Sequence, residues 1–170
     1  MPSHQDILID YLRDAYAMEQ QALSVIDRQL DRLKSYPELS ARLDQHRRET
    51  ESQAERLEAC LHRLGTDTSS LKTGMAKLST NLQAMMNTFA GDEVVKDMIS
   101  NYTFEHYEVV NYKILATTAD AAGQPEVARV AREILAEEEQ MIRWLDQNLD
   151  PIIRQYIARD ADMQTQAAKR

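Results

Sequence analysis

Apolar residues recur every three or four positions along four long stretches of the chain, as expected for α-helices that bury one face. In the first stretch the pattern runs through Leu8, Leu12 and Ala15. The helices predicted in this way cover about residues 5–34, 38–64, 92–122 and 125–149. Because all four long periodic stretches have the helical period, the pattern predicts an all-α fold.

The residues that interrupt the pattern indicate how the helices are connected. Tyr36–Pro37 separates the first two helices, and Gly123 followed by Pro125 separates the last two, with glycine after a helix and proline at the start of the next. Gly65 ends the second helix, and an amphipathic stretch at about residues 70–90 is predicted to be a crossover helix. Two tightly connected helix pairs joined by a long connection predict a four-helix bundle with one crossover.

The C-terminal segment is predicted to be separate from the fourth long helix. Proline lacks a backbone N–H, so Asp150–Pro151 is predicted to interrupt the fourth helix, with a short additional helix after it. The tail from about residue 160 is predicted to be frayed. The length of 170 residues is enough for one domain with a substantial core, so residues 1–170 are predicted to form a single domain.

Composition and charge narrow the class of protein. The chain has only four glycines and four prolines, which favours long helices over a sheet. Its net charge of −8 opposes binding to DNA or to an anionic membrane surface, and no apolar run reaches the ~20 residues of a membrane span. The single cysteine, Cys60, excludes an intrachain disulfide, and the N-terminus lacks the pattern of a signal peptide. A cytoplasmic protein is therefore expected.

Glutamates interrupt the apolar stripe near the middle of every long helix. These residues are Glu19, Glu49, Glu105, Glu108 and Glu138. Glu108 lies 15 residues before Gly123 and Glu138 lies 15 residues after it. At ~1.5 Å per residue, both are about 22 Å from that turn. Counted from the first turn in the same way, Glu19 and Glu49 lie within roughly 6 Å of each other along the bundle axis. The sequence therefore predicts that the carboxylates converge.

Clustered buried carboxylates repel one another and are costly to desolvate, so they must be protonated or must surround a cation. No lysine or arginine lies on the stripe near them to neutralise their charge. Bundle cores with a glutamate from each helix are typical of di-iron carboxylate sites, with manganese or zinc as alternatives. His46 and Gln53 lie on the same stripe and could be ligands or hydrogen-bond partners of ligands. Glu137 could replace Glu138 after a small helix rotation.

Four segments carry a resemblance to a known family: "YLRDAYAMEQQAL", "HRRETESQAERLE", "EHYEVVNYKILATTADAAG" and "ILAEEE". Together they resemble the YciE/YciF family of bacterial ferritin-like proteins over about residues 7–150. The resemblance implies a ferritin-like bundle with an additional helix, a homodimer, a di-metal site linked with iron, and a stress-associated role. It points to the same five glutamates and to Gln53. Better-known ferritin-like sites carry a histidine three residues after two of the glutamates, where this chain has Ser52 and Met141.

Three functions remain open at this point. The first is an iron-binding, ferritin-like stress protein that oxidises Fe(II) with oxygen or peroxide. The second is a structural or interaction protein with a vestigial carboxylate site. The third, a DNA-binding mini-ferritin cage, is disfavoured because the chain is acidic and because such cages place the metal between subunits.

Overall fold

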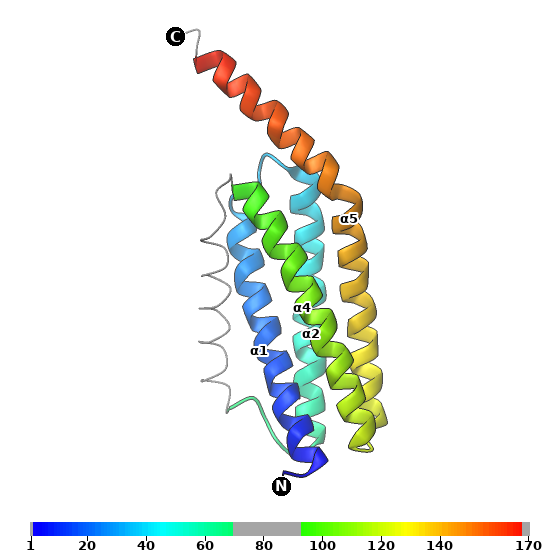
Figure 1. The fold of residues 1–170 in the computed structure, drawn as a ribbon. Helices are drawn as coiled ribbons and strands as arrows, with labels where there is room; N and C mark the ends of the chain where they lie inside the picture. The colour runs from blue at the N-terminus through cyan, green and yellow to red at the C-terminus, as the bar shows by residue number, and fades with distance from the viewer. Residues whose placement is uncertain (1, 70–92, 168–170) are drawn as a thin grey trace.

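The computed structural model describes residues 2–69 and 93–167, and all regular structure in these ranges is helical. The helices are α1 (His4–Leu30), α2 (Pro37–Arg63), α4 (Glu93–Ala121) and α5 (Pro125–Ala167). Figure 1 shows all four side by side in a bundle, with α2 and α4 running in the same direction. The connection between them must therefore cross the length of the bundle, as predicted. The crossover helix predicted at about residues 70–90 lies outside the described residues.

Local interactions define the ends of the helices. Ser3 caps α1, because the backbone N–H of Asp6 donates to Ser3 Oγ over 3.1 Å and Ser3 N–H donates back to Asp6 Oδ2 over 2.9 Å. Gly65 and Gly123 have φ values of 76° and 68°, a backbone conformation that glycine adopts without strain. The helix boundaries therefore follow from local chemistry.

The apolar core is divided into two clusters. The first cluster includes Leu12, Leu57 and Leu115, and the second lies around Leu39 and Leu145. Between the two, every helix contributes buried polar side chains, and this group is called the polar layer. Its members are Glu19, His46, Thr50, Gln53, Glu105, Glu108 and Glu138.

Helix α5 differs from the sequence prediction at its C-terminal end. The interruption predicted at Asp150–Pro151 does not occur, and the tail predicted to be frayed from about residue 160 is helical through Ala167. Ile152 is buried in the second apolar cluster, and the side chains of Gln155 and Arg159 both donate to the backbone oxygen of Ser35. These contacts with the α1–α2 turn offset the hydrogen bond that proline removes. Figure 1 shows this part of α5 leaning away from the bundle.

Among the described residues, no helix combines the length and the apolar character that a membrane span requires.

Candidate metal centre

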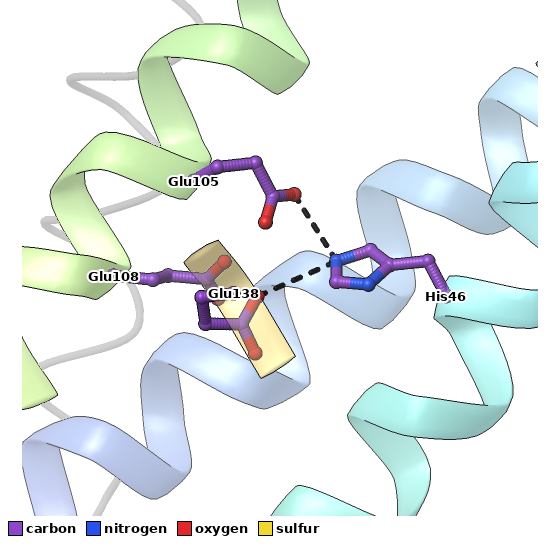
Figure 2. Close-up of side chains that lie close together, drawn as sticks. All are labelled: His46, Glu105, Glu108 and Glu138. Carbon is purple, nitrogen blue, oxygen red and sulfur yellow. Dashed lines mark ion pairs between the residues drawn. The ribbon is translucent and has the colours of Figure 1, made fainter. Parts of the chain in front are cut away.

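Four buried side chains from three helices converge in the polar layer, as Figure 2 shows. They are His46 from α2, Glu105 and Glu108 from α4, and Glu138 from α5, and one potential ligand atom of each lies within 4.8 Å of the others. The Nε2 atom of His46 is 3.1 Å from Glu105 Oε1 and 3.8 Å from Glu138 Oε2. All four residues are at most 4% exposed, so water does not screen the charges of their side chains.

Helix α1 contributes Glu19 to the same layer. Its side chain is fully buried, and its Oε1 atom accepts a hydrogen bond from the hydroxyl of Tyr112 on α4. The other oxygen, Oε2, has no hydrogen-bond partner among the described residues. Burial raises the pKa of Glu19 from 4.5 to about 8, although the hydrogen bond from Tyr112 opposes the shift. Glu19 therefore adds a carboxylate beside the group of four.

Glu49 is not brought into the buried group. Its side chain is 27% exposed, and its oxygens contact Arg42 Nη1 at 3.1 Å, Gln45 Nε2 at 2.8 Å and His46 Nδ1 at 3.2 Å. Burial acts to raise the pKa of Glu49, but the hydrogen bond from His46 and the positive charge of Arg42 lower it to about 2. The inward position is taken by its neighbour Thr50, which is 1% exposed.

Arg42 contacts Glu49 at the edge of α2, although the sequence pattern places no lysine or arginine on the stripe near the glutamates. It precedes Glu49 by seven residues, which is two helical turns, so both side chains lie along the same edge of α2. That spacing was the signal in the sequence. Glu49 is consequently held at the edge of the helix by an ion pair, while His46 turns inward.

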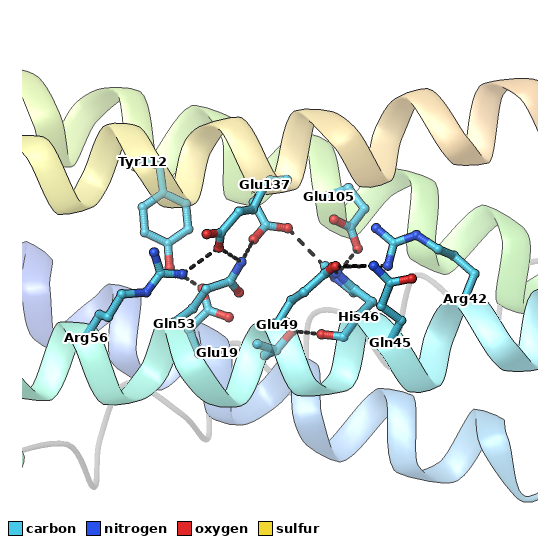
Figure 3. Close-up of polar contacts among 12 residues, drawn as sticks. Glu19, Arg42, Gln45, His46, Glu49, Gln53, Arg56, Glu105, Tyr112 and Glu137 are labelled. Atoms are coloured by element: carbon cyan, nitrogen blue, oxygen red, sulfur yellow. Dashed lines mark hydrogen bonds and ion pairs between the residues drawn. The ribbon is translucent and has the colours of Figure 1, made fainter.

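Gln53 connects the buried group with the surface between α2 and α5, as Figure 3 shows. It is fully buried, and its Nε2 atom donates to Glu138 Oε1 and, over 3.0 Å, to Glu137 Oε2. Glu137 is partly exposed and also accepts from Arg56 Nη2 over 2.5 Å. The structure therefore turns Glu138, rather than Glu137, into the core.

The electrostatics of the layer favour bound protons when no cation is present. Burial, followed by repulsion from neighbouring carboxylates, raises the pKa of Glu108 and of Glu138 well above the usual value. Burial opposes the charge on His46, but the carboxylates of Glu105 and Glu49 more than offset this effect and raise its pKa well above 6.5. At neutral pH the layer therefore holds protons that a cation would have to displace.

The donor atoms fit a metal centre. Five buried carboxylate oxygens have no hydrogen-bond partner among the described residues: Glu19 Oε2, Glu105 Oε2, both oxygens of Glu108, and Glu138 Oε2. Buried acceptors without partners are costly, and a cation would satisfy them. When ionised, the four carboxylates would balance the charge of two divalent ions. Several carboxylates with one imidazole suit iron or manganese better than softer metals.

Sequence comparison finds relatives along most of the chain. A family described as a domain of unknown function (DUF892) matches residues 3–158. The protein YciF of Escherichia coli strain K12 is 28% identical over 146 residues, which are 81% of this chain and 85% of YciF.

Solved structures share the arrangement of helices. A protein from Xanthomonas campestris pv. campestris superimposes with a TM-score of 0.79 at 31% identity, covering 94% of this chain and 99% of that one. The Escherichia coli stress protein YciF gives a TM-score of 0.71 at 26% identity, with coverages of 92% and 98%. A ferritin-like diiron-carboxylate protein from Bacillus anthracis gives 0.71 at 14% identity, with coverages of 88% and 99%, which shows the fold alone. The fold is ferritin-like.

Proposed function

Because the chain belongs to the family described as a domain of unknown function (DUF892), the family of YciF, we propose that it is a metal-binding, ferritin-like protein whose polar layer holds two iron ions. The observation that carries this proposal is the set of unpartnered buried carboxylate oxygens around one histidine. Such a layer is costly to bury unless something binds it. Manganese or zinc would satisfy the same oxygens, so the measurement of metal content below includes all three elements.

The ligands that we propose are the group of four and the additional carboxylate from α1. His46 would bind through Nε2 after losing its proton, and Glu105, Glu108 and Glu138 would bind through carboxylate oxygens. Glu19 would bind through Oε2, because its Oε1 is occupied by the Tyr112 hydroxyl. This bond orients Glu19 in the way that hydrogen-bond partners orient metal ligands.

Iron bound in this layer would supply electrons to oxygen or peroxide. The chain itself contributes the geometry of the ligands and the exclusion of water. Ser52 and Met141 cannot add the imidazoles that other ferritin-like sites carry, so we expect oxidation to be slow. The Escherichia coli relative is described as a stress protein, which supports a stress-associated role for this chain. We also propose, from the sequence alone, that the chain is a cytoplasmic homodimer.

Anaerobic titration with Fe(II), followed by desalting and analysis for iron, manganese and zinc, tests the site. The wild-type protein is expected to retain about two ions per chain. The double variant Glu108→Ala/Glu138→Ala should retain none, whereas Glu133→Ala, an exposed change on the same helix, should behave as wild type. Equal retention by the double variant and the wild type would refute the proposal.

A second candidate function is that of a structural or interaction protein with a vestigial site. It is favoured by the contacts that the layer makes without metal: His46 with Glu105, and Gln53 with Glu138. This alternative predicts the same melting temperature with Fe(II) and with a chelator. Binding at a hundredfold excess over Kd would instead stabilise the folded protein by about 2.7 kcal/mol.

A further inference from the structure

A groove of about 350 Å³ lies on the outer surface where α2 meets α5. Its lining residues are Gln45, Arg48, Glu49, Ser52, Arg56 and Glu137. Two of these are carboxylates with side chains 27% and 33% exposed, in contrast to the glutamates of the polar layer. The groove is therefore a place where carboxylates next to the candidate metal centre meet solvent.

One line of contacts runs from the groove through Gln53. Glu137 Oε2 accepts from Arg56 on its outer side and from Gln53 Nε2 on its inner side, and the same Nε2 donates to Glu138. Figure 3 shows Gln53 between the two helices, beside Glu137. Only one side chain thus separates the partly exposed Glu137 from the buried Glu138.

A second line of contacts runs through His46. Glu49 Oε2 lies 3.1 Å from Arg42 Nη1 and 3.2 Å from His46 Nδ1, and the opposite nitrogen of His46 faces Glu105. Each groove carboxylate is therefore neutralised from outside by an arginine and linked inward to the polar layer.

Gln53 also carries a buried polar atom without a hydrogen-bond partner in the described part of the chain. Its side chain is fully buried, yet its Oε1 atom has no hydrogen-bond partner among residues 2–69 and 93–167. An amide oxygen is a neutral ligand for divalent cations. The chain thus buries an unpaired oxygen between the groove and the metal centre, where an apolar residue would avoid the cost of desolvating a polar group.

We infer that Glu137, Gln53 and Glu49 form an outer cation site through which divalent metal ions reach the polar layer. The inference rests on the proposed function, because it needs a buried centre to receive the ion. Arg56 and Arg42 hold the carboxylates until a cation displaces them. Partly exposed ion pairs are weak, so this displacement is easy, whereas passage between apolar side chains would strip the ion of all its ligands at once.

Stopped-flow mixing of the metal-free full chain with Co(II) alone tests this route. Glu137→Gln is expected to bind Co(II) at least tenfold more slowly than wild type, with the same number of ions bound at equilibrium. Glu133→Gln is the matched control, because it removes the same charge from an arginine-paired glutamate one turn earlier on α5. This control should stay within twofold of the wild-type rate. Arg56→Gln should bind faster, because it frees Glu137.

Two results would overturn the inference while leaving the proposed function intact. One is a Glu137→Gln rate no slower than that of Glu133→Gln. The other is a lower number of ions bound by Glu137→Gln, which would make Glu137 a ligand of the buried centre. A wild-type protein that binds no Co(II) at equilibrium would instead refute the proposed function and the route together. Circular dichroism verifies that each variant is folded.

Discussion

The stability of the metal-free protein should fall as pH rises, and Glu19→Gln isolates the contribution of one buried carboxylate. Glutamine has nearly the same shape as glutamate, and its amide oxygen can still accept the hydrogen bond from Tyr112. The substitution therefore removes the proton equilibrium and keeps the packing.

The magnitude follows from the pKa of Glu19, which burial raises from 4.5 to about 8 in the folded protein. Between these values the folded chain holds a proton that the unfolded chain has released. The stabilisation is thus fully present below pH 4.5 and is lost as the pH approaches 8. One proton corresponds to about 1.4 kcal/mol per pH unit, so the full window gives at most about 4–5 kcal/mol.

Denaturant unfolding in the presence of a chelator, followed by circular dichroism at several pH values in this window, measures the effect. Glu19→Gln should lose stability less steeply than wild type, by about 1.4 kcal/mol per pH unit. The variant should nearly match wild type at the acidic end and exceed it at the alkaline end. Glu133→Gln should follow the wild-type curve, because that residue is exposed. Parallel curves for Glu19→Gln and wild type would refute the assignment of the raised pKa to Glu19.

Three further predictions concern other positions. Tyr112→Phe removes the hydroxyl that orients Glu19 and should weaken Co(II) binding about tenfold in a competition titration; unchanged affinity would contradict this role. Arg32→Met leaves the buried carboxylate of Asp97 without its ion pair and should lower the free energy of unfolding in urea by about 2 kcal/mol, and a neutral result would count against the pair. Gly123→Ala places a side chain at φ 68° and should lower the melting temperature through a cost of about 1 kcal/mol, whereas Gly123→Asn should cost less.

The helices and their order could be predicted because apolar spacing and turn residues act locally. The end of α5 could not be predicted in this way. Pro151 has a local cost, but its outcome depends on Ile152 reaching the second apolar cluster and on the carbonyl of Ser35 receiving two side chains. Ser35 lies 120 residues before Gln155 in the sequence. A rule that considers proline alone therefore cannot predict these contacts.

The candidate metal centre, too, could be predicted from the sequence only in part. The common depth of Glu19, Glu108 and Glu138 followed from counting residues to the turns, and all three are buried in the polar layer. The orientation of α2 did not follow, because Glu49 and Thr50 are adjacent at the edge of the stripe, and the helical period does not decide which one points inward. The ion pair of Glu49 with Arg42 decides it.

The polar layer also has a consequence for cooperativity, because it separates the two apolar clusters of the bundle. In the metal-free protein, buried carboxyl oxygens without hydrogen-bond partners among the described residues weaken the boundary, so the halves around Leu12 and Leu145 should open in separate steps. Native-state hydrogen exchange would then report two opening free energies. Metal ions bound to several helices at once would join the halves, and a single free energy should replace the two. With metal ions bound, the two halves would therefore unfold as a single cooperative unit.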